Sequence, residues 1–150
     1  LPPARARRPS SRGARRDGIF LLDRNGLVAS TVTCPVFALC RQFSASTSGI
    51  SLVGVTDTFP CRSFPSQFRL ACMLTLSGGR GSHAVEVWLT RSPVEESLLY
   101  RRKTEIDPVR TMDLLFDLSF RISEPGILFL TAKVDGYPVS DRRVRIYEPP

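Results

Sequence analysis

Strict alternation of apolar and polar residues in the second half of the chain is the feature that most limits its fold. Between residues 112 and 120 every second residue is Met, Leu or Phe, and Asp113 and Asp117 lie between them, with Leu115 as the exception. A period of two is typical of a β-strand with one buried face. A second alternating run, over 68–76, is apolar on its other face too, which predicts a strand in the centre of a sheet.

Six further short apolar runs are separated by turn residues, and helical periodicity is weak throughout. These candidate strands are 36–43, 50–56, 84–90, 97–103, 127–134 and 144–148. Short strands without crossover helices predict an all-β fold, an antiparallel β-sandwich of immunoglobulin-like size with about eight strands. A closed barrel is the alternative. We expect the sandwich domain to span 34–148.

Turn residues punctuate these runs. Asp135-Gly136 separates two runs by two residues that tolerate a positive φ, which predicts a tight hairpin. The SGGRGS segment at 77–82 predicts a longer Gly-rich connection, and Glu124-Pro125-Gly126 predicts another turn. Residues 19–33 are expected to be either an extension that precedes the sandwich domain or a hairpin around Asn25-Gly26.

Positive charge is concentrated at the start of the chain. Six of the 21 basic residues lie within the first 16 residues, which contain no acidic residue, so the other 15 nearly balance the 14 acidic residues. The body therefore lacks the basic face of a nucleic-acid-binding domain. Residues 1–18 are rich in Arg, Pro, Ser and Gly, which predicts a disordered basic tail.

Several interpretations of this tail remain open. It could tether nucleic acid or anionic lipid, act as a transit or export segment, or be an inert piece of translated upstream sequence. Asp23, Arg24 and Asn25 interrupt the apolar stretch that export requires. No run reaches the roughly 18 apolar residues of a transmembrane helix. We therefore expect a cytoplasmic protein with no membrane partner, and no nucleic-acid partner except through the tail.

Several segments between about residue 34 and residue 148 follow a common order and spacing. They are Ala38-Leu39-Cys40, Ser51-Leu52-Val53-Gly54-Val55, Asp57, Phe59, Phe64-Pro65, residues 78–89 and residues 123–146. In this order the chain resembles a bacterial family of small proteins known only as a domain of unknown function. The resemblance implies a compact β-sandwich and no activity, and the first 33 residues have no counterpart in it.

Cysteine and histidine limit the chemistry of the chain. Cys34, Cys40, Cys61 and Cys72 form no CxxC pair, so their spacing predicts neither a zinc site nor a thioredoxin-type site. We expect buried, reduced thiols, and two disulfides as the alternative for a secreted chain. His83 is the single histidine, and we expect it on the surface at a hairpin end. No cofactor and no metal site is predicted.

Other chemical motifs have structural interpretations. The SGGRG segment leads into a strand, whereas phosphate loops lead into a helix N-terminus. The Arg101–Lys103 and Arg142–Arg145 clusters would discourage edge-to-edge aggregation. Trp88 projects opposite Val85, Val87 and Leu89. We expect it in the core, or as a contact residue if its face is open.

These observations predict a non-enzymatic interaction or scaffold module whose partner is another protein, contacted by loops or an edge strand. Two alternatives belong to different classes: an exported carbohydrate-binding or adhesion module, and a hydrolase that uses His83. The candidate partner contacts are Trp88, His83, Arg80, Arg142 and Arg143. The oligomeric state stays open.

Overall fold

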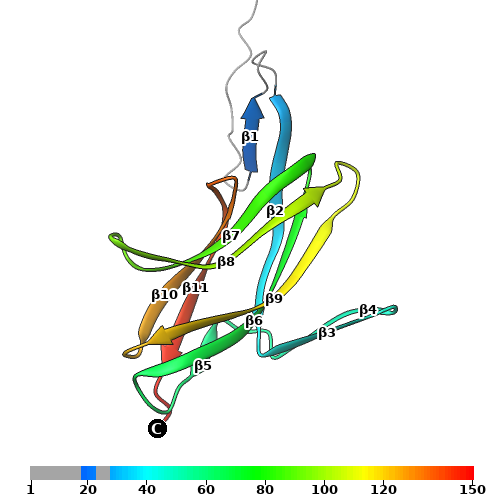
Figure 1. Cartoon of the computed structure of the whole chain (residues 1–150). Coiled ribbons are helices and arrows are strands. Elements are labelled where there is room, and N and C mark those ends of the chain that lie inside the picture. The colour runs from blue at the N-terminus through cyan, green and yellow to red at the C-terminus, as the bar shows by residue number, and fades with distance from the viewer. Residues whose placement is uncertain (1–17, 23–27) are drawn as a thin grey trace, which may run out of the picture.

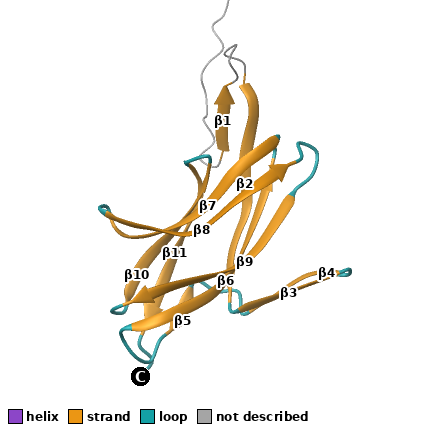
Figure 2. Ribbon diagram, viewed as in Figure 1, coloured by secondary structure: helices purple, strands orange, loops and turns teal. Residues whose placement is uncertain are grey.

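The computed structural model describes residues 18–22 and 28–150, with side chains described from residue 32 onward. These residues form eleven strands, and no helix occurs among them (Figures 1 and 2). The predicted all-β antiparallel sandwich is therefore confirmed, with more strands than the eight expected. The predicted disorder of the tail and the Asn25-Gly26 turn concern residues outside the described ones, apart from Gly18, which begins the first strand.

The first sheet has four strands in the order β1-β2-β6-β9, all antiparallel. Its strands are β1 (Gly18–Leu22), β2 (Val28–Cys40), β6 (Ser66–Ser77) and β9 (Met112–Ile122). β6 lies between β2 and β9, as the two apolar faces of its sequence predicted. In register, Leu70 is opposite Leu118 and Leu74 is opposite Leu114, so the alternating runs of β6 and β9 supply one inner face.

The second sheet has five strands in the order β5-β11-β10-β7-β8. They are β5 (Thr58–Pro60), β7 (Gly81–Ser92), β8 (Glu95–Ile106), β10 (Gly126–Val134) and β11 (Tyr137–Tyr147). β5 is parallel to β11, and the remaining pairs are antiparallel. Because Asp135 and Gly136 adopt φ values of 51° and 84°, the predicted hairpin between β10 and β11 is confirmed.

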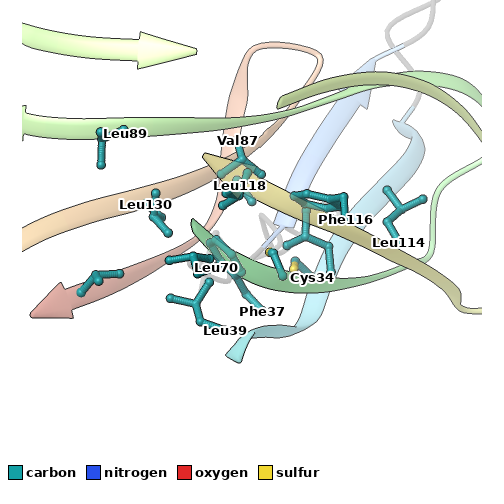
Figure 3. Close-up of a cluster of buried hydrophobic side chains, with 14 of the residues drawn as sticks. Cys34, Phe37, Leu39, Leu70, Val87, Leu89, Leu114, Phe116, Leu118 and Leu130 are labelled. Atoms are coloured by element: carbon teal, nitrogen blue, oxygen red, sulfur yellow. The ribbon is translucent and has the colours of Figure 1, made fainter. Parts of the chain in front are cut away.

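Apolar side chains from both sheets meet in one core. Figure 3 shows residues of β7 and β10, such as Val87 and Leu130, facing residues of β2, β6 and β9, such as Phe37, Leu70 and Leu118. All five are at most 2% exposed. All five side chains point inward, and inward-facing residues alternate with outward-facing ones along each strand. The period of two in the sequence therefore reflects the burial of every second side chain.

One hairpin leaves the sandwich. β3 (Gln42–Ser46) and β4 (Gly49–Val53) form a separate two-stranded sheet, which extends away from the body in Figure 1. The predicted sandwich strand at 36–43 is therefore confirmed for residues 36–40, which belong to β2, and was wrong for residues 42 and 43. The predicted sandwich strand at 50–56 was wrong, because residues 50–53 belong to this hairpin. β2 ends at Cys40, and the chain then pairs with itself around a turn between Ser46 and Gly49.

Candidate interaction surface

The five-stranded sheet has one face in the core and one face turned outward. Val85, Val87 and Leu89 of β7 are at most 2% exposed and face the core. Trp88 therefore projects from the opposite face, as its position between them predicted. In register with it lie Leu98 of β8 and Thr131 of β10, on the same outer face.

Large apolar side chains on this face remain accessible. Leu98 is 42% exposed, and Ile127 and Phe129 of β10 are each 44% exposed. Phe129 is opposite Thr90 of β7, two residues along the strand from Trp88. Cross-strand and diagonal neighbours of this kind lie close enough for aromatic side chains to touch. We call Trp88, Leu98, Ile127 and Phe129 the outer strip.

Trp88 is half-buried under a lysine. The Nζ atom of Lys133 lies 4.8 Å from the centre of the indole ring, and it is 3.7 Å from Oε2 of Glu96. The indole Nε1 is buried and has no hydrogen-bond partner among the described residues. The preferred interpretation of Trp88 as a core residue was wrong. The indole belongs to the outer face, and a flexible charged side chain covers it in place of a second sheet.

Charged side chains surround the covered end of the outer strip. Glu86 is 8% exposed, its Oε2 lies 3.7 Å from Nε of Arg101, and it is also in register with Lys133. Two cationic neighbours compensate for the removal of this carboxylate from water. This end of the face is therefore neutralised within the chain.

The opposite end of the face carries two arginines, and Asp57 lines the same surface hollow as both of them. Arg143 of β11 is in register with Phe129, and Arg145 is in register with Ile127. Both arginines are exposed, since Val144 takes the buried position between them. Within the described part of the chain, neither arginine belongs to an ion pair. The uncovered half of the outer strip thus adjoins two guanidinium groups.

Arg142 points to the other side of its strand. It is in register with the buried Leu130, and its Nε donates a hydrogen bond to the carbonyl oxygen of Phe37 on β2. It thereby bridges the two sheets where their edges approach. A hollow of about 440 Å³ opens beside it, lined among others by Leu39, Val55 and Asp57. Of the predicted contact residues, Trp88 and Arg143 thus share the outer face, on strands that flank β10, whereas Arg142 is directed to the other side of β11.

His83 and Arg80 lie at one end of the second sheet. His83 is 4% exposed, so its predicted surface position was wrong. Nδ1 lies 2.6 Å from Oδ2 of Asp135 in the β10–β11 turn, and Nε2 lies 2.7 Å from the carbonyl oxygen of Arg80. Sequence reasoning identified Asp135 as a turn residue and missed this second role, because residues 83 and 135 are brought together only by strand pairing. The Arg80 side chain is exposed.

The four cysteines are all buried, as expected. Cys72 is fully buried, and this burial, reinforced by the thiols of Cys34 and Cys40, raises its pKa well above the ordinary value. Burial also raises the pKa of Cys40, and the nearby carboxylate of Asp117 adds to this effect. Cys61 donates a weak hydrogen bond to the carbonyl oxygen of Ser63. The thiols are thus built into the core.

Neither a metal-binding cluster nor a membrane-spanning helix occurs among the described residues. They contain no group of three or more His, Cys, Asp or Glu side chains placed to hold a metal ion. Nor does this part of the chain include a helix with the length and apolar character needed to cross a membrane.

Comparison with known proteins gives no family. No family model and no curated protein matches the chain. Among solved structures, it is similar to part of a β-glucosidase from Listeria innocua in complex with glucose, at 14% identity and a TM-score of 0.49, covering 83% of this chain and 17% of that one. Comparable values hold for a β-glucosidase from Erythrobacter marinus (14%, 0.48, 81% and 16%) and one from Kluyveromyces marxianus (15%, 0.46, 82% and 15%). The chain spans less than a fifth of these enzymes, and their activity is not carried over.

Proposed function

We propose that this domain is a non-enzymatic protein-interaction module that binds the acidic and apolar surface of another protein on its outer strip. One observation carries the proposal: Phe129 is nearly half exposed in the middle of a sheet face and adjoins Arg143. Exposed aromatic and arginine side chains side by side are the composition typical of binding hot spots. We further propose that the protein acts in the cytoplasm.

The charge at this surface argues for an acidic partner. Arg143 and Arg145 are exposed and form no ion pair within the described residues, whereas Glu86 and Glu96 at the other end are already paired. A carboxylate of the partner could receive two hydrogen bonds from a guanidinium group. Phe129 and Ile127 would then lie under the apolar part of the same contact.

The covering of Trp88 favours protein over carbohydrate as the ligand. Sugar-binding modules present an open aromatic ring on which a pyranose can stack, and here Lys133 lies over the indole. The exported carbohydrate-binding or adhesion module therefore stays the alternative, which would require Lys133 to move away. Buried thiols also support the cytoplasmic proposal, because exported domains of this size commonly rely on disulfides.

The surroundings of His83 weigh against the hydrolase alternative. A general base needs one ring nitrogen free to accept the proton of a nucleophile. In this chain one nitrogen faces the carboxylate of Asp135, and the other faces a backbone carbonyl oxygen, not a hydroxyl group. Catalysis by His83 would have to begin by breaking one of these hydrogen bonds.

We also infer that the sandwich is of the immunoglobulin-like class, a fold that often serves recognition. The strand order supports this inference: β2, β6 and β9 face β8, β7, β10 and β11. Taken in chain order, this is the division of strands A, B and E against C, F and G in immunoglobulin-type domains, with β8 as an added strand next to C. Membership of the uncharacterised bacterial family stays a prediction.

A binding comparison with matched variants tests the proposed function. The full chain, its Phe129→Ser variant and its Ile50→Ser variant are used as bait in lysate of the source organism, and retained proteins are identified and then purified for direct titration. Ile50 lies on the β3–β4 hairpin and is 39% exposed, so it controls for the loss of an exposed apolar side chain. We expect one acidic protein that binds the chain and the Ile50→Ser variant equally, and the Phe129→Ser variant at least tenfold more weakly.

Two results would overturn this proposal. If the same partner binds all three proteins with equal affinity, the outer strip is not the contact surface. If no protein is retained and the chain instead binds oligosaccharides in a glycan array, with loss on replacement of Trp88, the carbohydrate-binding alternative replaces it.

A further inference from the structure

While Asp135 is ionised, the hydrogen bonds of His83 require two protons on its ring. Nδ1 is 2.6 Å from a carboxylate oxygen of Asp135, and Nε2 is 2.7 Å from the carbonyl oxygen of Arg80. A carbonyl oxygen and an ionised carboxylate accept hydrogen bonds and donate none, whereas a neutral imidazole carries a single N–H group. Both contacts are satisfied together only by the imidazolium form.

Asp135 is placed to remain the ionised partner. Its side chain is 35% exposed to water, and its other oxygen, Oδ1, accepts a hydrogen bond of 2.9 Å from the backbone N–H of Ala84. Water and a backbone N–H group thus both reach the carboxylate. Its own backbone N–H donates to the carbonyl oxygen of Ala84 at 2.8 Å, so the β10–β11 turn is held firmly against β7.

Other charged groups near His83 are less directly placed. Thr104 of β8 is its cross-strand neighbour, flanked along the strand by Lys103 and Glu105, which are exposed. The side chain of Arg80 is exposed as well, and only its carbonyl oxygen contacts the ring. Of these groups, Asp135 alone forms an ion pair with His83 within the described residues.

The two hydrogen bonds join three separate segments. These are the connection between β6 and β7, which contains Arg80, the start of β7 at His83, and the β10–β11 turn at Asp135. Backbone bonds with Ala84 hold the turn in any protonation state. Among the described residues, the bond from Nε2 is the only hydrogen bond that a side chain makes to the backbone of Arg80. Loss of one ring proton therefore acts mainly on the β6–β7 connection.

We propose that His83 is a proton-controlled latch, which holds the β6–β7 connection closed while its ring carries two protons and releases it when one proton leaves. The folded protein makes both hydrogen bonds with the imidazolium form, and the unfolded chain makes neither. Loss of one ring proton leaves one of the two contacts without a donor, so the latch is closed at low pH and opens as the ring becomes neutral.

Nuclear magnetic resonance of the full chain tests the latch directly, because His83 is the single histidine and its ring signals need no assignment. Ring nitrogen shifts are recorded from about pH 5 to about pH 9, the range over which imidazole titrates. Amide hydrogen exchange of residues 78–80 is measured in the same samples and divided by the exchange rate of an unstructured peptide at each pH. The amide of Leu130 in the core reports that the protein stays folded.

We expect both ring nitrogens to be protonated at the acidic end, and protection of residues 78–80 to fall about tenfold as one proton is lost, with Leu130 unchanged. In the Asp135→Asn variant the loss should occur at lower pH, because the carboxylate charge is gone while Asn still tolerates the positive φ of the turn. Asp141→Asn, an exposed residue of β11, removes the same charge elsewhere and should leave the curve unchanged.

The His83→Gln variant separates the latch from a structural role. The Gln side chain cannot change its charge. Protection of residues 78–80 should therefore be low, and it should vary with pH no more than the protection of Leu130 does. The proposal is overturned if the folded protein shows only one protonated ring nitrogen throughout the range. It is equally overturned if the ring titrates while protection of residues 78–80 stays constant. Binding at the outer strip is a separate claim, which these results leave untouched.

Discussion

Phe129 of β10 and Arg143 of β11 are cross-strand partners on the outer face of the five-stranded sheet. Neither side chain is covered by a second layer, and each faces water beside another residue of its own kind, Ile127 and Arg145. An apolar pair next to an unpaired cationic pair contributes little to the stability of an isolated domain. The arrangement is better explained by what it can bind.

Replacing Phe129 by Ser should separate stability from binding. The side chain is 44% exposed, so the free energy of unfolding should change by less than about 1 kcal/mol. The free energy of binding to the partner should fall by at least about 1.4 kcal/mol, which corresponds to tenfold weaker binding. Urea denaturation and a binding titration on the same samples measure the two quantities. A loss of stability larger than the loss of affinity would show that Phe129 is a structural residue.

Removing the lysine above the indole should be visible in fluorescence. Trp88 is the single tryptophan, so emission of the chain reports on it alone. The Lys133→Ala variant uncovers the ring, which should move its emission to longer wavelength and cost roughly 0.5–1 kcal/mol of stability. Arg101→Ala, which removes a cation bound to Glu86, is the control and should leave the emission unchanged. An unchanged spectrum for Lys133→Ala would mean that Lys133 does not cover Trp88 in solution.

Gly79 should be intolerant of a side chain for reasons of space. A Cβ atom at this position would lie 2.7 Å from Cγ2 of Val32 and 3.0 Å from Cγ2 of Ile106. The Gly79→Ala variant should therefore lose about 1–3 kcal/mol of stability through overpacking. In the double variant with Val32→Ala, the loss should be smaller than the sum of the two single losses, because the methyl group enters the space vacated. Thermal denaturation measures these stabilities. If the loss in the double variant equals the sum of the two single losses, this packing is wrong.

The thiol of Cys72 should be unreactive toward alkylating reagents in the folded protein. Burial raises its pKa well above that of an ordinary thiol, so the reactive thiolate is scarce at pH values where exposed cysteines react. We expect alkylation of Cys72 at about pH 8 to proceed only as fast as the chain unfolds. Mass spectrometry of the modified peptides, with and without denaturant, measures this. Rapid modification of Cys72 under native conditions would show that the core opens locally.

Much of the fold could be predicted from residue patterning. The alternation over 112–120 identified β9, the two apolar faces of 68–76 identified the central strand β6, and Asp135-Gly136 identified the β10–β11 turn. Each of these signals is local, because strand period and turn conformation depend on neighbouring residues alone. The short strand β5 was missed, since three residues carry no period.

The remaining features depend on partners distant in sequence. His83 is buried because strand pairing brings it to Asp135, 52 residues away. Trp88 lies on an outer face because the first sheet packs against only one side of β7, which alternation along that strand cannot reveal. The β3–β4 hairpin leaves the sandwich although its apolar residues resemble those of a core strand. For His83, for Trp88 and for the hairpin, the local sequence was compatible both with the expected position and with the one that the structure shows.

Site-specific photocrosslinking tests the central claim most directly. A benzophenone amino acid replaces Phe129 in one full-length protein and Ile50 of the β3–β4 hairpin in another, and each is irradiated in lysate of the source organism. The proposed outer strip predicts one discrete adduct with an acidic protein from position 129, suppressed by excess unlabelled chain and not by its Phe129→Ser variant. Adducts from position 50 alone, or adducts at position 129 that the Phe129→Ser variant suppresses equally well, would contradict it.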